Sequence, residues 1–204
     1  VRWLLVGDDF RFGARRTGDV EMLTTFSQKS GSFEVEIMPS FSVNGLRVSS
    51  TAIRDALTGG DLNLAKQLLG RPYSISGRVV DGDKLGKQIG FPTANIQLNH
   101  NRPPLMGIYV VEISSDISSS LPATMRGVAS LGIRPTTHAT GKPVLEVHLF
   151  DFYQEIYGHH LRVHFLHKLR DEEKYPDLET LTRQIKQDVI DAKNYFMTQA
   201  DLVS

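Results

Sequence analysis

The sequence predicts an α+β protein in which an α/β segment precedes a small all-β barrel or sandwich. Before residue 70, the order of elements is strand, helix, strand, helix, helix, which is typical of part of an α/β unit. After residue 73, short strand-like runs follow one another with turn signals between them. The last element is a helix that carries an apolar stripe. We therefore expect two domains, covering residues 1–72 and 73–204.

The first domain begins with an apolar run at residues 3–6, which Gly7 stops and which we expect to be a buried strand. A helix is expected over 19–28, and alternating apolar and acidic residues at 33–37 predict a second strand. A serine pair and a glycine pair delimit the next helix, between residues 49 and 60. Asp61 begins another helix, which runs to Leu69.

The second domain contains five recognisable strands, expected near residues 74–80, 107–114, 125–131, 144–150 and 160–167. The final helix begins after Asp177, a suitable N-cap residue. Its apolar residues recur every three or four positions and are Leu178, Leu181, Ile185, Val189, Ala192 and Phe196. This stripe predicts that the helix packs against the sheet.

The composition is that of an ordinary soluble globular protein, with 40% apolar and 23% charged residues. Lys plus Arg and Asp plus Glu number 23 each, which argues against a nucleic-acid partner. The absence of cysteine excludes disulfides and thiolate chemistry and fits a cytoplasmic protein. No apolar run approaches the roughly 20 residues of a membrane span, so we expect no membrane partner. The N-terminus does not resemble a signal peptide. Because the first residue is Val1 and not Met, we expect a processed or truncated chain.

A glycine-rich segment, residues 77–95, is the strongest local signal. Four glycines would let backbone amides approach phosphate oxygens, and two lysines would add positive charge. The spacing fits neither a P-loop nor a dinucleotide-binding fingerprint. A phosphate-binding loop and an ordinary solvated hairpin turn therefore both remain open on this pattern.

Two pairs of polar residues follow. Thr93 and Asn95 point the same way in an extended segment, and their oxygens suit Mg²⁺ that is also held by ATP phosphates. The alternative is that they satisfy local backbone groups.

Glu146 and His148 share one face of the strand predicted at 144–150. Glu146 could act as a general base if that face lines a pocket, and otherwise it is a solvated carboxylate.

The ordered set of motifs resembles the riboflavin kinase family, and the whole chain resembles the C-terminal two-thirds of the bacterial bifunctional riboflavin kinase/FAD synthetases. The motifs that carry the resemblance lie, in order, at residues 77–95, 107–109, 127–136, 145–152, 157–158 and 169–175. The resemblance implies a six-stranded Greek-key barrel with a C-terminal helix. It implies transfer of the ATP γ-phosphoryl group to the riboflavin 5′-hydroxyl, which gives FMN and ADP.

The resemblance also implies roles for individual residues. Glu146 would be the catalytic base, and Thr93 and Asn95 would hold Mg²⁺. The ATP-binding residues would be Gly82, Lys87, Thr93 and Tyr157, and the flavin-binding residues would be Arg170, Glu173 and Tyr175. Asp81 and Lys87 stand where the family more often has His and Arg. The six histidines between His138 and His167 could instead form a metal site, but no pair of them forms the helical His-Glu-x-x-His motif of a zinc enzyme.

Residues 1–72 resemble the C-terminal part of the FMN adenylyltransferase domain of the same bifunctional enzymes. The resemblance implies that Ser50, Thr51 and Arg54 bind phosphates at a helix start, whereas the plain alternative is a serine cap. The family's His-x-Gly-His-type motif does not occur in these 204 residues. We therefore expect a kinase that makes FMN but no FAD. The alternatives are an adenylyltransferase within a complete bifunctional enzyme and a flavin-binding module without catalysis.

Overall fold

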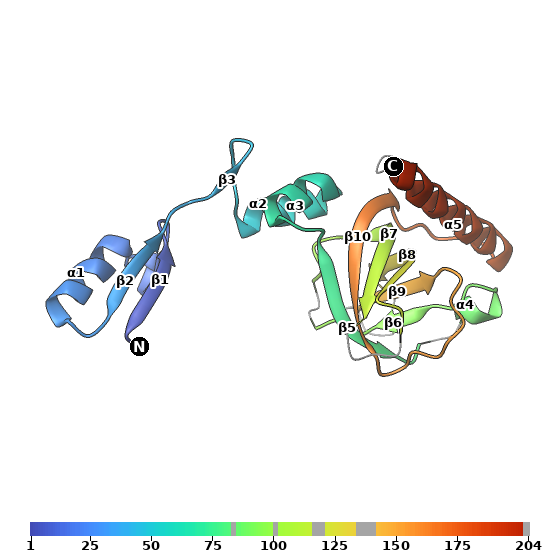
Figure 1. Ribbon diagram of the computed structural model, residues 1–204, viewed down its shortest axis with the longest axis horizontal. Coiled ribbons are helices and arrows are strands. Elements are labelled where there is room, and N and C mark those ends of the chain that lie inside the picture. Colours follow the sequence, from blue (N-terminus) through green and yellow to red (C-terminus); the bar gives the residue numbers. More distant parts are fainter. Residues whose placement is uncertain (83–84, 100–101, 116–120, 134–141, 202–204) are drawn as a thin grey trace. The chain divides into compact units, whose positions relative to one another are not determined.

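The computed structural model describes residues 1–82, 85–99, 102–115, 121–133 and 142–201, and it divides into two compact units (Figure 1). The N-terminal unit comprises Val1–Ser49, and the barrel unit comprises Ser50–Ser204. Residues 50–72 therefore pack with the barrel, although the sequence groups them with the first domain. The functional boundary after residue 72 stays a prediction.

The N-terminal unit is a strand–helix–strand unit, as predicted. Strand β1 (Trp3–Gly7) pairs in parallel with β2 (Glu34–Met38), and helix α1 (Val20–Ser30) connects them after the 3₁₀ turn η1 (Ala14–Arg16). The Asp19 side chain caps α1 by accepting a hydrogen bond from the Met22 amide at 2.9 Å. The prediction that β1 is buried is wrong: Trp3 is 51% exposed, because within this unit α1 packs mainly against β2.

A short hairpin, which sequence reasoning missed, closes the N-terminal unit. It consists of β3 (Ser42–Val43) and β4 (Leu46–Arg47). Its two turn residues, Asn44 and Gly45, both have positive φ angles, of 52° and 79°. An Asn-Gly pair favours this two-residue hairpin turn, so the signal was present in the sequence.

Two helices open the barrel unit where the sequence predicts them, α2 (Ser50–Thr58) and α3 (Leu62–Leu69). Asp61 caps α3 by accepting a hydrogen bond from the Leu64 amide at 2.9 Å. Gly70 ends the same helix in the left-handed conformation, which a residue without Cβ adopts at little cost. The apolar faces of both helices are buried in the core cluster of the barrel, which explains why they belong to this unit.

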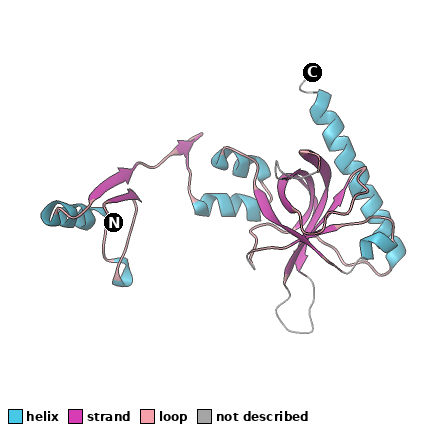
Figure 2. Cartoon of the chain, turned by 60° about the horizontal axis from the view of Figure 1, so that its bottom comes forward, coloured by secondary structure: helices cyan, strands magenta, loops and turns pink. Residues whose placement is uncertain are grey.

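Six antiparallel strands form a closed barrel in the order β10-β5-β6-β9-β8-β7 (Figure 2). The strands are β5 (Ser74–Val80), β6 (Ala94–Ile96), β7 (Gly107–Ser115), β8 (Thr124–Ile133), β9 (Pro143–Leu149) and β10 (His160–Arg170). The consecutive strands β7, β8 and β9 form a meander, and β9 returns to pair with β6. This is the Greek-key connection, so the expected fold is confirmed.

The barrel is filled by the alternate residues of its strands. Tyr109, Val163 and Phe165 are at most 1% exposed, and the Tyr109 ring packs edge-on against Phe165. The Tyr109 hydroxyl donates a hydrogen bond to the Met106 carbonyl at 2.7 Å. Burial, reinforced by the nearby Asp171 carboxylate, raises the pKa of Tyr109 to about 12.

Helix α5 (Leu178–Asp201) packs outside the barrel, against β7, β8 and β10. Asp177 caps it, as predicted, by accepting a hydrogen bond from the Thr180 amide at 2.7 Å. Ala192 and Phe196 are buried against the outer face of the barrel. Although α5 has 24 residues, neither it nor any other helix in the described part of the chain has the apolar length needed to cross a bilayer.

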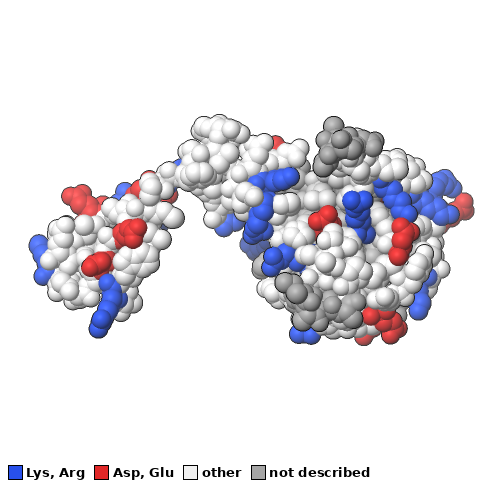
Figure 3. Space-filling model, viewed as in Figure 1, with Lys and Arg blue, Asp and Glu red and all other residues white. Residues whose placement is uncertain are grey.

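The glycine-rich segment contains a short helix, α4 (Leu85–Gln88), where a loop was expected. Residues 83 and 84 of this segment lie outside the described residues, as do Arg134, Pro135, Thr136 and His138. Acidic and basic side chains are interspersed over the barrel on the face that Figure 3 presents, which agrees with the equal numbers of each in the sequence.

Candidate active site

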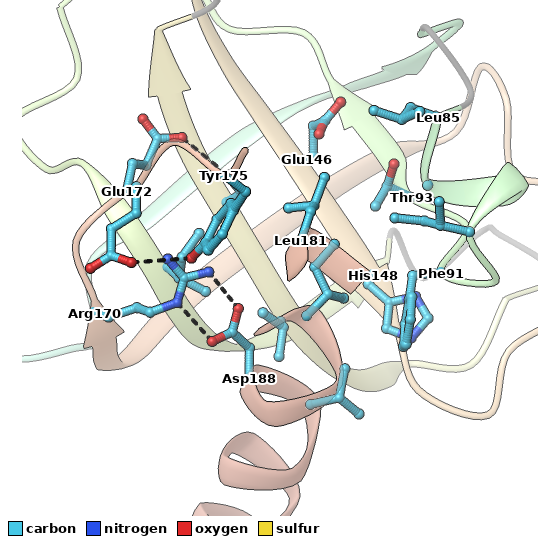
Figure 4. A pocket seen from close by; sticks show the side chains of 18 residues that line it. Leu85, Phe91, Thr93, Glu146, His148, Arg170, Glu172, Tyr175, Leu181 and Asp188 are labelled. Atoms are coloured by element: carbon cyan, nitrogen blue, oxygen red, sulfur yellow. Dashed lines mark hydrogen bonds and ion pairs between the residues drawn. The ribbon is translucent and has the colours of Figure 1, made fainter. Parts of the chain in front are cut away.

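Two cavities of the barrel unit adjoin at Thr93. The first has a volume of about 310 Å³ and is also lined by Glu146 and Arg170 (Figure 4). The second has a volume of about 270 Å³ and is also lined by Lys87 and Tyr157. Because Thr93 borders both cavities, groups bound in the two would meet at its side chain.

The first cavity has apolar walls and a polar end. Leu181, Ile185 and Val189 of α5 form one wall, and Ile108 and Val128 on the outer faces of β7 and β8 form the other. Figure 4 shows Arg170, Glu172 and Asp188 on the side of the cavity away from Phe91. A cavity of this kind suits a flat, largely apolar ligand that has a few polar groups.

Asn95 on β6 and Glu146 on β9 are register partners in the barrel. Residues that lie opposite each other in an antiparallel pair project from the same face, and here their neighbours Ala94 and Val147 project into the core. Asn95 is only 8% exposed, and its amide lies against Gly82. A Cβ atom at Gly82 would come within 2.2 Å of the Asn95 Nδ2 atom, so the absence of a side chain there gives the amide its place.

His148 connects β9 to the segment that carries Thr93. Its Nδ1 atom lies 2.9 Å from the Pro92 carbonyl oxygen. Because a carbonyl oxygen only accepts, Nδ1 must carry the proton in this bond. The ring also packs edge-on against Phe91, with the ring centroids 5.4 Å apart. These contacts fix the backbone immediately before Thr93.

Arg170 lies at the end of β10, after a register irregularity between Lys168 and Arg170 that redirects the strand. Its Nε and Nη2 atoms donate to the two carboxylate oxygens of Asp188 on α5, at 2.8 and 2.7 Å. Gln184 donates a further hydrogen bond to Asp188 at 3.0 Å. The hydrogen bonds to Asp188 are the main cause that raises the pKa of Arg170, so the guanidinium remains charged.

The segment that follows Arg170 lies along the rim of the first cavity. Ser130 donates a hydrogen bond to the Glu172 carboxylate at 3.3 Å, and Tyr175 donates one to Glu173 at 3.4 Å. Gly132 lies directly beneath the Glu172 carboxylate, which would collide with a Cβ atom at that position. Partial burial raises the pKa of the Tyr175 hydroxyl, so this group is a hydrogen-bond donor at neutral pH.

The second cavity lies between α4 and the segment that links β9 to β10. Lys87 contributes the positive charge, while Phe152, Tyr153 and Tyr157 contribute aromatic surface. Tyr157 is half exposed, so its ring remains accessible from solvent. A basic group next to aromatic side chains can hold a ligand that combines a phosphate chain with a planar ring.

The structure brings most of the predicted site residues together. Those that line the first cavity are Thr93, Glu146, Arg170, Glu173 and Tyr175. Lys87, Thr93 and Tyr157 line the second cavity, whereas Gly82 and Asn95 contact each other and line neither cavity. Ser50, Thr51 and Arg54 are on the first turns of α2 and line neither cavity.

Sequence reasoning missed Asp188 and Glu172, which both line the first cavity. Asp188 had a visible signal, because it falls on the apolar stripe of α5, three residues after Ile185 and four before Ala192. An acidic residue at such a position needs a buried partner. Glu172 had no comparable signal, since it sits in a run of charged residues.

Two of the other described histidines make structural contacts. His164 contacts the Ser114 hydroxyl through Nε2 at 3.0 Å, and His167 stacks on Tyr195 with ring centroids 5.3 Å apart. No three His, Cys, Asp or Glu side chains in the described ranges come together as a possible metal site.

Fold and site together define a Greek-key barrel protein with two adjoining cavities of a size that suits small molecules. The family model described as riboflavin kinase matches residues 69–196. The chain therefore belongs to the riboflavin kinase family. A second model, described as FAD synthetase, matches residues 1–52.

Curated relatives carry both activities in their name. The bifunctional riboflavin kinase/FMN adenylyltransferase of Haemophilus influenzae is 48% identical over 199 residues, which are 96% of this chain and 62% of that protein. The protein of the same name from Escherichia coli K12 is 44% identical over 196 residues, or 96% of this chain and 61% of that protein. The chain thus spans about three fifths of the length of these relatives.

A solved structure shares the fold. It is described as a macrolide-efflux protein from Streptococcus pneumoniae and superposes with a TM-score of 0.68 at 34% identity. The match covers 89% of this chain and 57% of that one.

Proposed function

We propose that the barrel unit is an ATP-dependent riboflavin kinase, which transfers the γ-phosphoryl group of ATP to the 5′-hydroxyl of riboflavin. The observation that carries the proposal is the position of Thr93, where the two cavities adjoin, with Glu146 in the first of them. Phosphoryl transfer needs a donor and an acceptor held end to end at one point, and this arrangement provides such a point.

Riboflavin would occupy the first cavity. Its flat ring system would lie between the apolar side chains of α5 and the outer face of the barrel. Arg170 and Tyr175 would contact the ring from the rim. The ribityl chain would extend toward Glu146, which places the 5′-hydroxyl next to Thr93.

ATP would occupy the second cavity. The adenine ring would pack near Tyr157, and Lys87 would attract the phosphate chain. The γ-phosphoryl group would then point toward Thr93, the residue that both cavities share.

Glu146 would act as the general base. Its carboxylate would accept the proton of the 5′-hydroxyl while that oxygen forms a bond to the γ-phosphorus. The bond between the γ-phosphorus and the bridging oxygen breaks at the same time, and ADP leaves with the electron pair. The products are FMN and ADP, and the proton stays on Glu146 until solvent removes it.

The side chains near the junction fit a magnesium ion. The Thr93 hydroxyl and the Asn95 carbonyl are uncharged, hard oxygen donors, and Gly82 leaves space for the Asn95 amide. Two such donors are few, which is typical of Mg²⁺ that is held mostly by substrate phosphates and water. When bound, Mg²⁺ would neutralise negative charge on the phosphates.

The direct test is incubation of the purified chain with riboflavin, ATP and Mg²⁺, followed by chromatography of the flavins. FMN that appears with matching amounts of ADP supports the proposal. If riboflavin binds and no FMN forms, the chain is a flavin-binding module without catalysis.

The second candidate function is FMN adenylyl transfer within a longer bifunctional chain. It is favoured by the FAD synthetase model that matches residues 1–52. Ser50, Thr51 and Arg54 would bind phosphates at the start of α2. The test joins this chain to an N-terminal half that carries the His-x-Gly-His motif. Arg54→Ala should then reduce FAD formation and leave FMN formation unchanged.

A further inference from the structure

Asp188 is the one acidic residue that is buried among the described residues, with 3% of its surface exposed. It lies on the face of α5 that packs toward the barrel, where its neighbours on the stripe are apolar. A buried carboxylate lowers stability unless hydrogen bonds and an opposite charge compensate for its lost hydration. An apolar residue at this position would avoid that cost, so the carboxylate calls for a functional explanation.

The partner of Asp188 is the guanidinium of Arg170, and the geometry leaves that group little freedom. Asp188 receives the Nε and Nη2 hydrogen bonds, and the Asp171 carbonyl accepts one from Nη1 at 3.0 Å. Acceptors thus engage all three guanidinium nitrogens within the plane of the group. A bidentate pair of this kind fixes both position and orientation.

One face of the guanidinium lies toward Tyr175. The Cζ atom of Arg170 is 5.8 Å from the centroid of the Tyr175 ring, within the range of a cation–π contact. Both side chains line the first cavity, as Figure 4 shows for Arg170, Tyr175 and Asp188. These bonds use three of the five N–H groups of Arg170 and leave its flat face, with two N–H groups, for contact with a ligand.

We propose that Asp188 is a positioning residue, which holds Arg170 so that its guanidinium face, next to Tyr175, packs on the ring system of the flavin. The inference rests on the proposed function, since it takes the first cavity as the riboflavin site. It assigns to α5 a role beyond packing: the helix supplies the carboxylate that orients a binding group at the end of β10. Gln184 supports the carboxylate from one helical turn away.

The experiment compares Asp188→Asn with Asp191→Asn. Asp191 lies on the same helix and accepts the same kind of hydrogen bond, from Gln187 at 2.8 Å, but it is exposed. Riboflavin affinity is measured by quenching of flavin fluorescence. Asp188→Asn should weaken it about tenfold to a hundredfold, the range for loss of a hydrogen bond to a charged group. Asp191→Asn should leave it unchanged.

A double-mutant cycle separates positioning from a general structural effect. With Arg170 replaced by Leu, there is nothing for residue 188 to orient, so adding Asp188→Asn should change the riboflavin affinity by less than about twofold. If Asp188→Asn has the same effect with and without Arg170, or no effect at all, the inference is overturned. The Arg170→Lys variant should bind weakly as well, because Lys keeps the charge but lacks a flat face.

Folding is followed by the near-ultraviolet circular dichroism of the tyrosines. If Asp188→Asn does not fold, Gln184→Ala removes only the supporting hydrogen bond and should still weaken riboflavin binding about threefold. An unchanged affinity in folded Gln184→Ala would then overturn the inference. A wild-type chain that binds no riboflavin overturns the proposed function together with this inference. Normal wild-type binding with an unaffected Asp188→Asn overturns the inference alone.

Discussion

Asn95 and Glu146 face each other across the β6–β9 pair, which places an amide and a carboxylate side by side on the outer surface of the barrel. Thr93 lies two residues before Asn95, and His148 lies two residues after Glu146. The hydrogen bond from His148 to the Pro92 carbonyl continues the alignment of the two segments beyond the strand. The neighbouring strands β6 and β9 therefore carry Asn95 and the proposed base, and Thr93 immediately precedes β6, so the barrel fixes their spacing.

Replacing Glu146 with Gln should reduce turnover and preserve the fold. The side chain keeps its size and polarity but can no longer accept the hydroxyl proton. General-base catalysis contributes about 10²–10⁴-fold, so kcat should fall by that factor. The measurement is the initial rate of FMN formation at saturating riboflavin and ATP. Glu179→Gln on the exposed face of α5 is the control and should keep wild-type turnover. A kcat of Glu146→Gln within a few-fold of wild type would exclude the proposed role.

Replacing Thr93 with Ala should impair the Mg²⁺-dependent use of ATP far more than the binding of riboflavin. The hydroxyl is proposed to contact the metal ion and not the flavin ring. We expect the KM for Mg·ATP to rise about tenfold or more, a usual cost of damage to a metal site, while the riboflavin Kd changes little. Thr93→Ser keeps the hydroxyl and should recover most of the activity. If Thr93→Ala weakens both ligands equally, Thr93 has a structural role instead.

Gly82→Ala tests the contact between the glycine-rich segment and Asn95. The new Cβ atom would lie 2.2 Å from the Asn95 amide nitrogen, so the buried amide or the loop must move. We expect a stability loss of about 1–3 kcal/mol from overpacking and a lower kcat/KM for Mg·ATP. Gly132→Ala is the matched comparison, because there the obstructing atoms belong to the end of the flexible Glu172 side chain. A fully active Gly82→Ala would show that the Asn95 position is unimportant.

The strands and helices of this protein could be predicted from sequence wherever one face of an element is buried. β9 is an example: Leu145 and Val147 enter the core while Glu146 and His148 do not. Strand β6 could not be predicted from the sequence, because it has only three residues and all of them are buried, so no alternation of apolar and polar residues is visible. The burial of β1 was misjudged because an apolar run does not reveal how much of its surface the chain will cover.

The site residues also divide into those that the sequence points to and those that only the fold brings together. The spacing of Thr93 and Asn95 and the outward position of Glu146 marked them as candidates, because period two places side chains of an extended segment on one face, and the family resemblance supplied their roles. Their meeting across two strands could not be predicted, since it depends on the β6–β9 register. The Arg170–Asp188 pair joins a strand end to a helix 18 positions later in the chain. No local sequence pattern specifies such a contact. Only Asp188 could be noticed from the sequence, because it is an acidic residue on the apolar stripe of α5.

Protonation of His164 should make the barrel unit less stable as the pH falls. Burial, the main cause, lowers the pKa of His164 below its ordinary value of 6.5; Arg162 and Arg71 add to the effect and Glu112 opposes it. The unfolded chain therefore takes up a proton at a higher pH than the folded chain. The contribution of His164 to stability is complete above about pH 6.5 and is lost as the pH falls through the lower folded pKa.

The measurement is the free energy of unfolding in urea between pH 7 and pH 5. All six tyrosines lie between residues 73 and 195, so tyrosine absorbance follows the barrel unit, whereas Trp3 reports on the N-terminal unit. His164→Gln keeps an acceptor for Ser114 and should flatten the pH dependence of the barrel transition. The exposed His160→Gln on the same strand should leave it as in wild type. If the free energy of unfolding of the barrel unit depends on pH equally in all three proteins, this prediction is contradicted.

Expressed as these 204 residues alone, the chain should make FMN and no FAD. Barrel and α5 contain every residue proposed for the kinase reaction, so phosphorylation of riboflavin should need nothing from residues 1–49. Adenylyl transfer needs charge stabilisation at the α-phosphate, and this is usually the largest catalytic contribution. The family's His-x-Gly-His motif would supply it, and that motif does not occur in this sequence.

Ser50, Thr51 and Arg54 cannot replace that motif. The start of α2 offers backbone amides and a partial positive charge, which can bind a phosphate but do not activate it for attack by FMN. The test incubates the chain with riboflavin, excess ATP and Mg²⁺, and separates the flavins by chromatography over a time course. FMN should accumulate to completion with no FAD peak, and added FMN should also remain unconverted. FAD that forms at a rate proportional to the concentration of the chain, and that Arg54→Ala abolishes, would show that residues 1–72 catalyse adenylyl transfer by themselves.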